Sequence, residues 1–124
     1  MGWITDEESP RCNVTTERAL TREQKTKLLG KEPDYLLYKS GTHHVIAAIE
    51  AKAKGENLDK ALKEAIEKYA RPLKIPTVFV TDGSFFRTWH HTDEKPLRID
   101  SEPVNQLLGE STLLRFISSG SSIL

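Results

Sequence analysis

The chain has 124 residues, enough for one domain. Its 18 basic and 18 acidic residues cancel, which excludes a domain that holds nucleic acid by bulk positive charge alone. The single cysteine, Cys12, cannot form an internal disulfide, and no apolar run has the length of a signal peptide or a membrane span. These features predict a cytoplasmic domain that does not enter a membrane.

Residues 1–32 form a first segment, which is polar and shows little hydrophobic periodicity. This composition predicts mostly loop, with one short helix around Arg22 to Leu29. Long loops are uncommon inside compact domains. The segment therefore suggests that the chain begins inside a domain.

A pair of antiparallel strands is predicted directly after this segment. Tyr35 to Tyr38 form the first strand, and residues 39–42 have the composition of a turn. The second strand runs from His43 to Ala53. Its centre, Val45 to Ile49, is apolar at every position, which indicates a strand buried on both faces inside a sheet.

A helix and another buried strand follow the hairpin. Asn57 is a suitable cap for a helix, apolar residues recur at helical spacing from Leu58 onward, and Pro72 ends the pattern. Residues 75–81 have the composition of a buried strand. Strand, helix and strand at this spacing predict a parallel pair with a right-handed crossover.

The C-terminal third predicts further short elements. Asp82-Gly83 predicts a tight turn into a strand over residues 85–90, and residues 97–99 predict a short strand. Ser101 and Pro103 have the composition of a helix start, and Gly109 would weaken that helix. The apolar face of this helix would hold Val104, Leu107, Leu108, Leu113, Leu114 and Ile117.

Together these elements predict an α/β fold. An antiparallel hairpin and a parallel βαβ crossover would form a mixed central sheet, with helices flanking it. The core would span residues 33–117. Residues 118–124 would form a frayed tail.

The hairpin brings two carboxylates together if its turn is centred on Thr42. Asp34 and Glu50 are then equidistant from the turn and face each other, with Cβ atoms roughly 5 Å apart. Lys52 lies two positions beyond Glu50 and projects from the same face. A register shift of one residue would place these side chains on opposite faces.

This arrangement favours a hard divalent cation. Two carboxylates so close repel each other unless a positive charge lies between them. Mg²⁺ suits the position because it takes a few carboxylate oxygens, keeps several waters and binds phosphate. The candidate ligands are Asp34, Glu50 and the backbone carbonyl of Ala51, and Mn²⁺ is a candidate substitute ion. Three roles are open to Lys52: to hold a water, to help deprotonate it, or to donate to a phosphate oxygen.

A purely structural interpretation competes with this one. An aspartate after a proline is often a turn residue, and a Glu–Lys pair on a strand is often solvated. Glu50 favours the site because it follows five apolar residues in an interior strand. An unpaired carboxylate in that position costs several kcal/mol.

The order of these segments resembles a known nuclease family. Pro33-Asp34, sixteen positions before Glu50-Ala51-Lys52, resembles the PD-(D/E)xK signature. Tyr69-Ala70, Pro76 to Gly83 and Trp89 follow in the order of one branch. That branch is the N-terminal nuclease domain of the R subunit of type I restriction-modification enzymes, and the resemblance spans about residues 33 to 90.

The resemblance implies a restriction-endonuclease-like fold and Mg²⁺-dependent cleavage of double-stranded DNA. It implies that Asp34 and Glu50 are metal ligands, that Lys52 is the catalytic lysine, and that Tyr69 contributes to the site. It also implies an ATP-dependent motor domain, with methyltransferase and specificity subunits as partners. No GxxxxGK[ST] motif for such a motor occurs in the chain, which suggests a fragment or a stand-alone relative.

Two departures from the family pattern keep other functions open. The family usually has an N-terminal helix with a glutamate that ends near a Gly-Trp pair; here Gly2-Trp3 directly follows Met1, so we expect this helix to be missing. Ala65 stands where the branch often has a glutamine. One alternative is a nuclease-like fold that has lost catalysis and serves as a DNA-binding or assembly module. The other is a repair or recombination nuclease that acts on DNA ends.

Three further groups of residues have simpler explanations. The pairs His43-His44 and His90-His91 lie at strand ends, where adjacent side chains point to opposite faces, so a histidine metal site is disfavoured. Aromatic residues in the last strand are expected to cover the sheet rather than stack on bases; they are Phe85, Phe86 and Trp89. Basic residues after the motif would be solvated or would contact phosphates; they are Lys52, Lys54, Lys60, Lys63, Lys68, Arg71 and Lys74.

Overall fold

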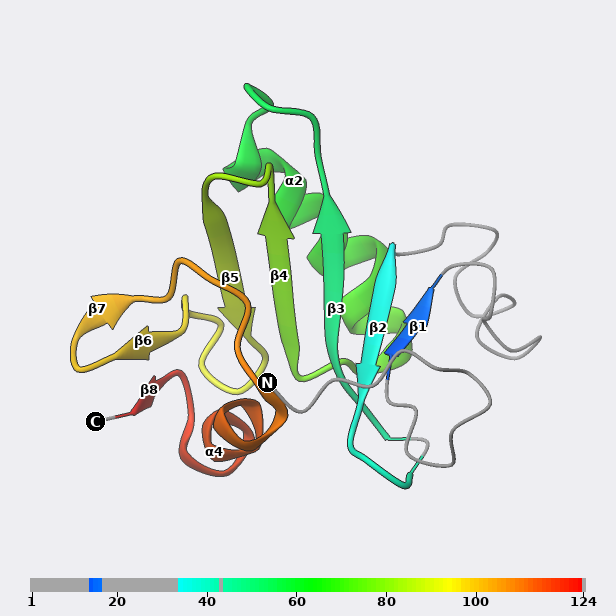
Figure 1. The fold of residues 1–124 in the computed structure, drawn as a ribbon, viewed down its shortest axis with the longest axis vertical. Coiled ribbons are helices and arrows are strands. Elements are labelled where there is room, and N and C mark those ends of the chain that lie inside the picture. The colour runs from blue at the N-terminus through cyan, green and yellow to red at the C-terminus, as the bar shows by residue number, and fades with distance from the viewer. Residues whose placement is uncertain (1–13, 17–33, 43, 124) are drawn as a thin grey trace.

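The computed structural model describes residues 14–16, 34–42 and 44–123. Its centre is a mixed sheet with the strand order β1-β2-β3-β4-β5 (Figure 1). The five strands are β1 (Val14–Thr16), β2 (Tyr35–Tyr38), β3 (Val45–Ala51), β4 (Thr77–Thr81) and β5 (Phe86–His90). The predicted α/β class and the predicted mixture of strand directions are therefore confirmed.

The strand pairings follow the predicted order along the chain. β2 and β3 are antiparallel, β3 and β4 are parallel across a helical crossover, and β4 and β5 are antiparallel. β3 is shorter than predicted, since its pairing with β4 ends where Ala51 lies beside Thr81. β1 pairs with β2 from within the segment predicted to be mostly loop, and the helix predicted at residues 22–29 lies outside the described residues.

The crossover is one helical segment with three parts. They are α2 (Leu58–Ala65), the π-helix η2 (Ile66–Ala70) and α3 (Arg71–Leu73). Asn57 caps the segment as predicted, since its side-chain oxygen accepts a hydrogen bond from the backbone N–H of Lys60 at 3.1 Å.

The end of the crossover differs from the prediction. Pro72 lies inside α3, and the helix ends at Lys74, which adopts a left-handed conformation with φ of 56°. The Arg71 N–H bonds to the Ile66 carbonyl five residues back. This wider turn makes room for the proline ring and its missing N–H, so the proline does not break the helix.

The cap gives a first prediction. Asn57→Ala should lower the free energy of unfolding by about 1 kcal/mol, because the Lys60 N–H loses its partner. Urea denaturation followed by circular dichroism measures the change. Asn57→Ser keeps a capping oxygen and serves as the control; equal losses in the two variants would contradict the capping role.

Side chains alternate between the two faces of the central sheet, so the core has two halves. Leu36, Ala48, Val78 and Val80 face the crossover helix, and Trp89 joins them from β5. A second set faces the opposite layer, which includes α4 (Glu110–Ser119); it comprises Leu37, Ala47, Ile49, Phe79, Leu113 and Phe116. The molecule thus has three layers, with the sheet in the middle (Figure 1).

The predicted C-terminal helix starts later than expected. Residues 101–109 contain the short strand β7 (Glu102–Pro103), and the helix begins only after Gly109, whose extended backbone forms its N-terminal boundary. Val104 and Leu108 are buried from an irregular segment rather than from a helix face. Apolar side chains that pack from a loop can imitate helical spacing.

The segment from Ser118 to Ser122, predicted to fray, instead completes the fold. It ends α4 and enters β8 (Ser122–Ile123), which pairs in parallel with β6 (Arg98–Ile99) in a small sheet ordered β7-β6-β8. The Ser121 hydroxyl donates a hydrogen bond to Asp93 at 2.6 Å. Hydrogen bonds to a distant part of the chain hold this tail in place, and the local sequence pattern does not predict them.

Candidate functional site

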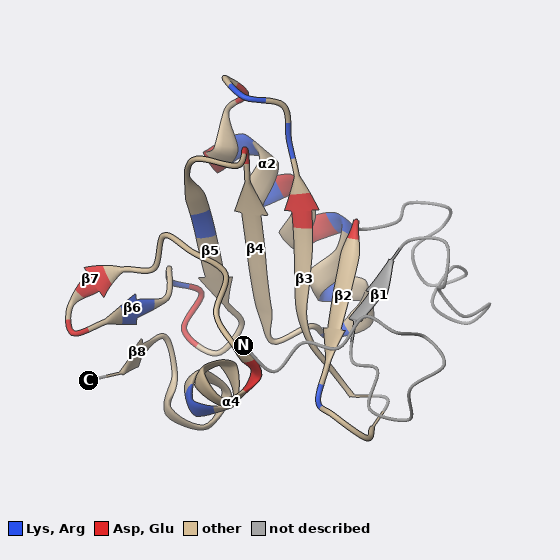
Figure 2. Cartoon of the chain, in the orientation of Figure 1, with Lys and Arg blue, Asp and Glu red and all other residues tan. Residues whose placement is uncertain are grey.

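Two acidic residues face each other at one edge of the central sheet. The pairs Tyr35–Ile49, Leu36–Ala48 and Leu37–Ala47 have the register predicted from a turn centred on Thr42. The register shifts only beyond Leu37, towards the turn. Asp34, one residue before β2, is therefore across from Glu50 in β3, and Figure 2 shows acidic positions side by side at these two strand ends.

Hydrogen bonds join the predicted site residues. A side-chain oxygen of Asp34 accepts a hydrogen bond from the Ala51 N–H at 2.7 Å. The carboxyl groups of Asp34 and Glu50 are hydrogen-bonded to each other, and the hydroxyl of Tyr69 donates to Glu50. The structure thus brings together groups from the residue before β2, from β3 and from the π-helix.

Lys52 completes the cluster just beyond the end of β3. Its backbone N–H donates to the Thr81 carbonyl at 2.8 Å, which ties it to β4. Its side chain is partly buried, and its charge lies close enough to lower the pKa of Glu50. The four predicted side chains therefore converge on one face of the sheet.

Glu50 is the most perturbed group of the cluster. Burial, followed by the hydrogen bond and negative charge of Asp34, raises its pKa from 4.5 to about 7. The Tyr69 hydrogen bond and the charge of Lys52 oppose this shift without cancelling it. Near neutral pH the carboxyl group of Glu50 is therefore protonated for part of the time, because burial and the nearby Asp34 disfavour its charged form.

This charge balance fits a divalent cation. A cation would replace the proton on Glu50 and stabilise its carboxylate beside that of Asp34. Among the residues that the structure describes, no group of three or more His, Cys, Asp or Glu side chains is placed to hold a metal. Two carboxylates with a backbone carbonyl suit Mg²⁺, which keeps several water ligands, better than Zn²⁺, which prefers nitrogen and sulfur.

The π-helix is the part of the site that the sequence did not predict. Single π-turns inside α-helices are rare, and those that occur often lie at functional sites. Here the turn carries Tyr69 on the buried face, four residues after Ala65. Ala65 has no polar side-chain atom, and the neighbouring Glu64 pairs with Lys68 at 3.8 Å, so neither replaces the glutamine of the resembled family.

The other aromatic and histidine residues considered for the site differ in how deeply they are buried. Trp89 and Phe86 pack into the two halves of the core, whereas Phe85 is 56% exposed. His90 is fully buried; its ring hydrogen-bonds to the Phe116 carbonyl at 2.9 Å and accepts from the Thr92 N–H at 3.1 Å. These contacts give His90 a structural role, and His43 lies outside the described residues.

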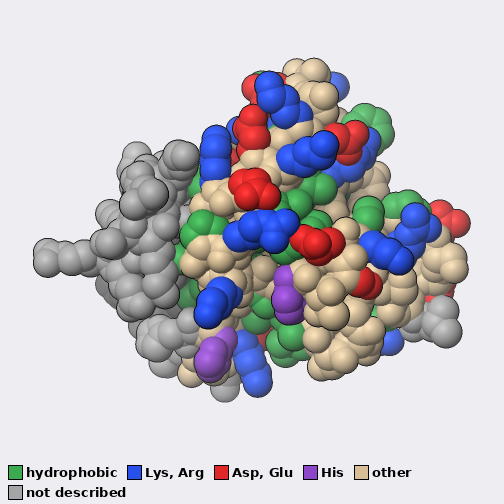
Figure 3. Space-filling view, turned by 180° about the vertical axis from the view of Figure 1, so that it is seen from behind, with side chains coloured by type: hydrophobic (Ala, Val, Ile, Leu, Met, Phe, Trp, Pro, Cys, Tyr) green, Lys and Arg blue, Asp and Glu red, His purple; other side chains and the backbone are tan. Residues whose placement is uncertain are grey.

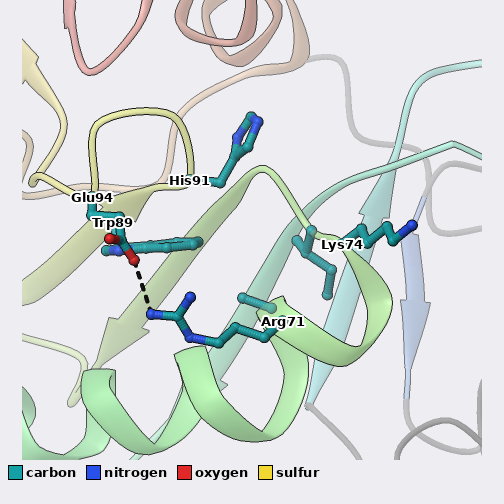
Figure 4. Close-up of a pocket in the computed structure, with 7 residues that line it drawn as sticks. Arg71, Lys74, Trp89, His91 and Glu94 are labelled. Atoms are coloured by element: carbon teal, nitrogen blue, oxygen red, sulfur yellow. Dashed lines mark hydrogen bonds and ion pairs between the residues drawn. The ribbon is translucent and has the colours of Figure 1, made fainter.

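The basic residues after the motif do not form a continuous positive surface. Figure 3 shows acidic and basic side chains interspersed over the helix-covered face. Arg71, for example, is bonded to Glu67 at 3.0 Å and to Glu94 at 2.9 Å. It lines an open pocket of about 650 Å³ with Lys74 and Trp89 (Figure 4). Glu50 lies beside Val80, towards the end of β4.

The described residues therefore define a mixed α/β protein with a paired-carboxylate and lysine cluster at one edge of its sheet. Comparison of the chain with models of protein families, with characterised proteins and with solved structures found no match. The resemblance to the PD-(D/E)xK nucleases thus stays a prediction from the sequence. No helix in the described part of the chain combines the length and the apolar character needed to cross a membrane.

Proposed function

We propose that this chain is a Mg²⁺-dependent endonuclease domain of the restriction-endonuclease-like, PD-(D/E)xK class. It hydrolyses phosphodiester bonds of double-stranded DNA. The proposal rests on four side chains that lie together at one edge of the sheet: Asp34, Glu50, Lys52 and Tyr69. A buried carboxyl group with a raised pKa, a second carboxylate beside it and a nearby lysine are the groups that metal-assisted cleavage of a phosphodiester requires.

Asp34, Glu50 and the Ala51 carbonyl would hold the metal. When bound, the ion supplies a water of lowered pKa and neutralises charge on the attacked phosphate. The chain's own hydrogen bonds fix the orientation of these ligands. The Ala51 N–H holds Asp34, and the Tyr69 hydroxyl holds Glu50.

Lys52 supplies the positive charge next to the carboxylates. Its backbone bond to Thr81 sets the position from which the side chain extends. The ammonium group donates to a phosphate oxygen or to the attacking water, and it stabilises negative charge that builds on the phosphate. Because the group is partly buried, water screens this interaction less than it would screen an exposed one.

The balanced charge of the chain bears on its partners. With 18 basic and 18 acidic residues and an interspersed helix face (Figure 3), the domain holds DNA weakly by electrostatics alone. Weak binding of its own favours a domain that works beside other DNA-binding parts, and the resemblance to the type I R subunit implies that these are an ATP-dependent motor domain and methyltransferase and specificity subunits.

Cleavage of supercoiled plasmid in the presence of Mg²⁺ or Mn²⁺ tests the proposal. We expect nicking that stops when EDTA removes the metal. Asp34→Ala and Lys52→Ala should each lower the rate by about 100-fold. Lys39→Ala removes the same charge at the far end of the hairpin and is the matched control, because Lys39 is exposed and distant from Glu50.

Three results would point elsewhere. Cleavage that survives both site substitutions would rule out this site. Tight binding of duplex DNA without cleavage in any metal would favour a binding or assembly module. A strong preference for linear over circular DNA would favour a nuclease that acts on ends.

A further inference from the structure

Two large hydrophobic side chains are exposed in the part of the chain that the structure describes, and both lie at the edge of the sheet that carries the carboxylates. They are Tyr35, 42% exposed, and Phe85, 56% exposed. Single exposed apolar residues are common on proteins, so exposure alone does not indicate a binding site. Phe85 differs because hydrogen bonds fix its backbone and because it lies at the same end of the sheet as the candidate site.

The turn that presents Phe85 is held by a set of short hydrogen bonds. A side-chain oxygen of Asp82 accepts from the N–H groups of Ser84 and Phe85, both at 2.9 Å. The Thr81 hydroxyl donates to the Phe85 carbonyl at 2.8 Å and accepts from the Gly83 N–H at 3.0 Å. Gly83 has a φ of 92°, which a residue without a side chain adopts at little cost. The turn is thus prearranged to present a ring.

Two residues of β5 that follow Phe85 face the crossover helix, as the carboxylates do. Trp89 packs under the crossover helix, and Arg87 bonds to Asp59 of that helix at 3.1 Å. Phe85 lies in the turn one residue before β5. Extension of the alternation from Trp89 and Arg87 by one step of two assigns Phe85 to the same face. Glu50 belongs to the same face, since it alternates with Ala48 of the same core half.

Tyr35 lies on the other face. It is two residues before Leu37, which packs in the core half that includes α4. The two exposed rings therefore share an edge of the sheet but not a face, which makes Tyr35 the natural control for Phe85.

We propose that Phe85 stacks on an unpaired base close to the scissile phosphate, so that the site acts best on DNA that contains unpaired nucleotides. This inference rests on the proposed nuclease function. A phenyl ring has no polar atom with which to bind phosphate, and it binds DNA through the flat face of a base. In an intact duplex the neighbouring base pairs cover those faces, so the ring needs a base that has left the stack.

The separation between Phe85 and Glu50 suits a contact with a base near the scissile phosphate. β5 is two strands away from β3, and Phe85 lies two residues beyond Arg87, which is level with Glu50. The usual strand spacing and rise per residue then give a separation of roughly 12 Å. This distance spans about three nucleotides of a DNA strand. A ring already held in place also loses little conformational entropy on binding, which favours affinity.

Binding of short fluorescent DNAs, measured by anisotropy in Ca²⁺ to limit cleavage, tests the inference. One DNA is a fully paired duplex, and the other is the same duplex with a few central unpaired nucleotides. The wild-type chain should prefer the second. Phe85→Ala should weaken binding to it by about tenfold and leave binding to the paired duplex nearly unchanged.

Two further substitutions separate stacking from simple hydrophobic contact. Phe85→Tyr should keep the preference, and Phe85→Leu should lose most of it because the flat ring is gone. Tyr35→Ala should change the affinity by less than about twofold. Equal behaviour of the leucine and tyrosine variants, or an unchanged preference in Phe85→Ala, would overturn the stacking role.

The same assay distinguishes the two proposals. Plasmid cleavage with no effect of Phe85→Ala on binding would overturn only the role of Phe85. A wild-type chain that neither binds these DNAs nor cleaves plasmid would overturn both proposals.

Discussion

Glu50→Gln should nearly abolish Mg²⁺-dependent cleavage and yet make the protein more stable above neutral pH. The amide keeps the shape of Glu50, accepts a hydrogen bond from Tyr69 and donates one to Asp34, but it cannot supply a second negative ligand. We expect the cleavage rate to fall by about a thousandfold, at the upper end of losses from removing one charge-stabilising group.

Glu50→Gln should raise stability although it lowers activity, because the pKa of Glu50 is raised in the folded protein. The folded protein holds the Glu50 proton up to a pKa of about 7, whereas the ordinary value is 4.5. Between those values the folded state binds more protons than the unfolded state. The contribution of Glu50 to stability is therefore fully present below about pH 4.5 and is lost as the pH rises through about 7.

Glutamine does not ionise, so the variant does not lose this stability as the pH rises. At about pH 8 the Glu50→Gln variant should exceed the wild type in free energy of unfolding by on the order of 1–2 kcal/mol, allowing for solvent screening of this half-buried group. Near about pH 4.5 the two proteins should have similar stability. Added Mg²⁺ should then stabilise the wild type more than the variant, because only the wild type offers both carboxylates.

Denaturation by urea at both pH values, with and without Mg²⁺, measures these differences. Glu56→Gln makes the same change at an exposed position and should alter neither stability nor cleavage. A Glu50→Gln variant that is less stable than the wild type at the higher pH would contradict the described charge balance. Full cleavage activity in that variant would contradict the proposed site.

Phe116→Ala should destabilise the fold by about 3–5 kcal/mol. Phe116 is fully buried in the core half that lies opposite the crossover helix. Its backbone carbonyl also accepts the hydrogen bond from His90, so α4 is joined to β5 by both packing and a buried polar contact. Removal of the ring leaves a cavity that the surrounding side chains cannot fill completely.

Thermal or urea unfolding measures this loss, which is a large share of the stability of a domain of this size. Phe85→Ala makes the same chemical change at the exposed turn and should shift stability by no more than about 0.5 kcal/mol. If the two variants lost equal stability, α4 would not pack on the sheet as described.

Local pattern was enough to predict the elements that form the candidate site. The apolar run in β3, the turn after β2 and the cap at Asn57 each depend on neighbours in sequence. The hairpin register followed from the turn, and it brought Asp34 opposite Glu50. Because side chains alternate along a strand, Lys52 then had to share the face of Glu50.

Contacts between distant segments decided the remainder. Ser121 bonds to Asp93 and β8 pairs with β6, although the tail itself has no strand pattern. The later start of α4 depends on the burial of Val104 and Leu108 from a loop.

The sequence by itself determined the hairpin, the crossover and the spacing of Asp34, Glu50 and Lys52, because turn chemistry and the periodicities of strand and helix act over a few residues. Only the tertiary structure decided that Tyr69 reaches Glu50 from a π-turn and that burial beside Asp34 raises the pKa of Glu50 to about 7. Desolvation and through-space hydrogen bonds depend on which segments pack together, and that packing is a property of the whole fold.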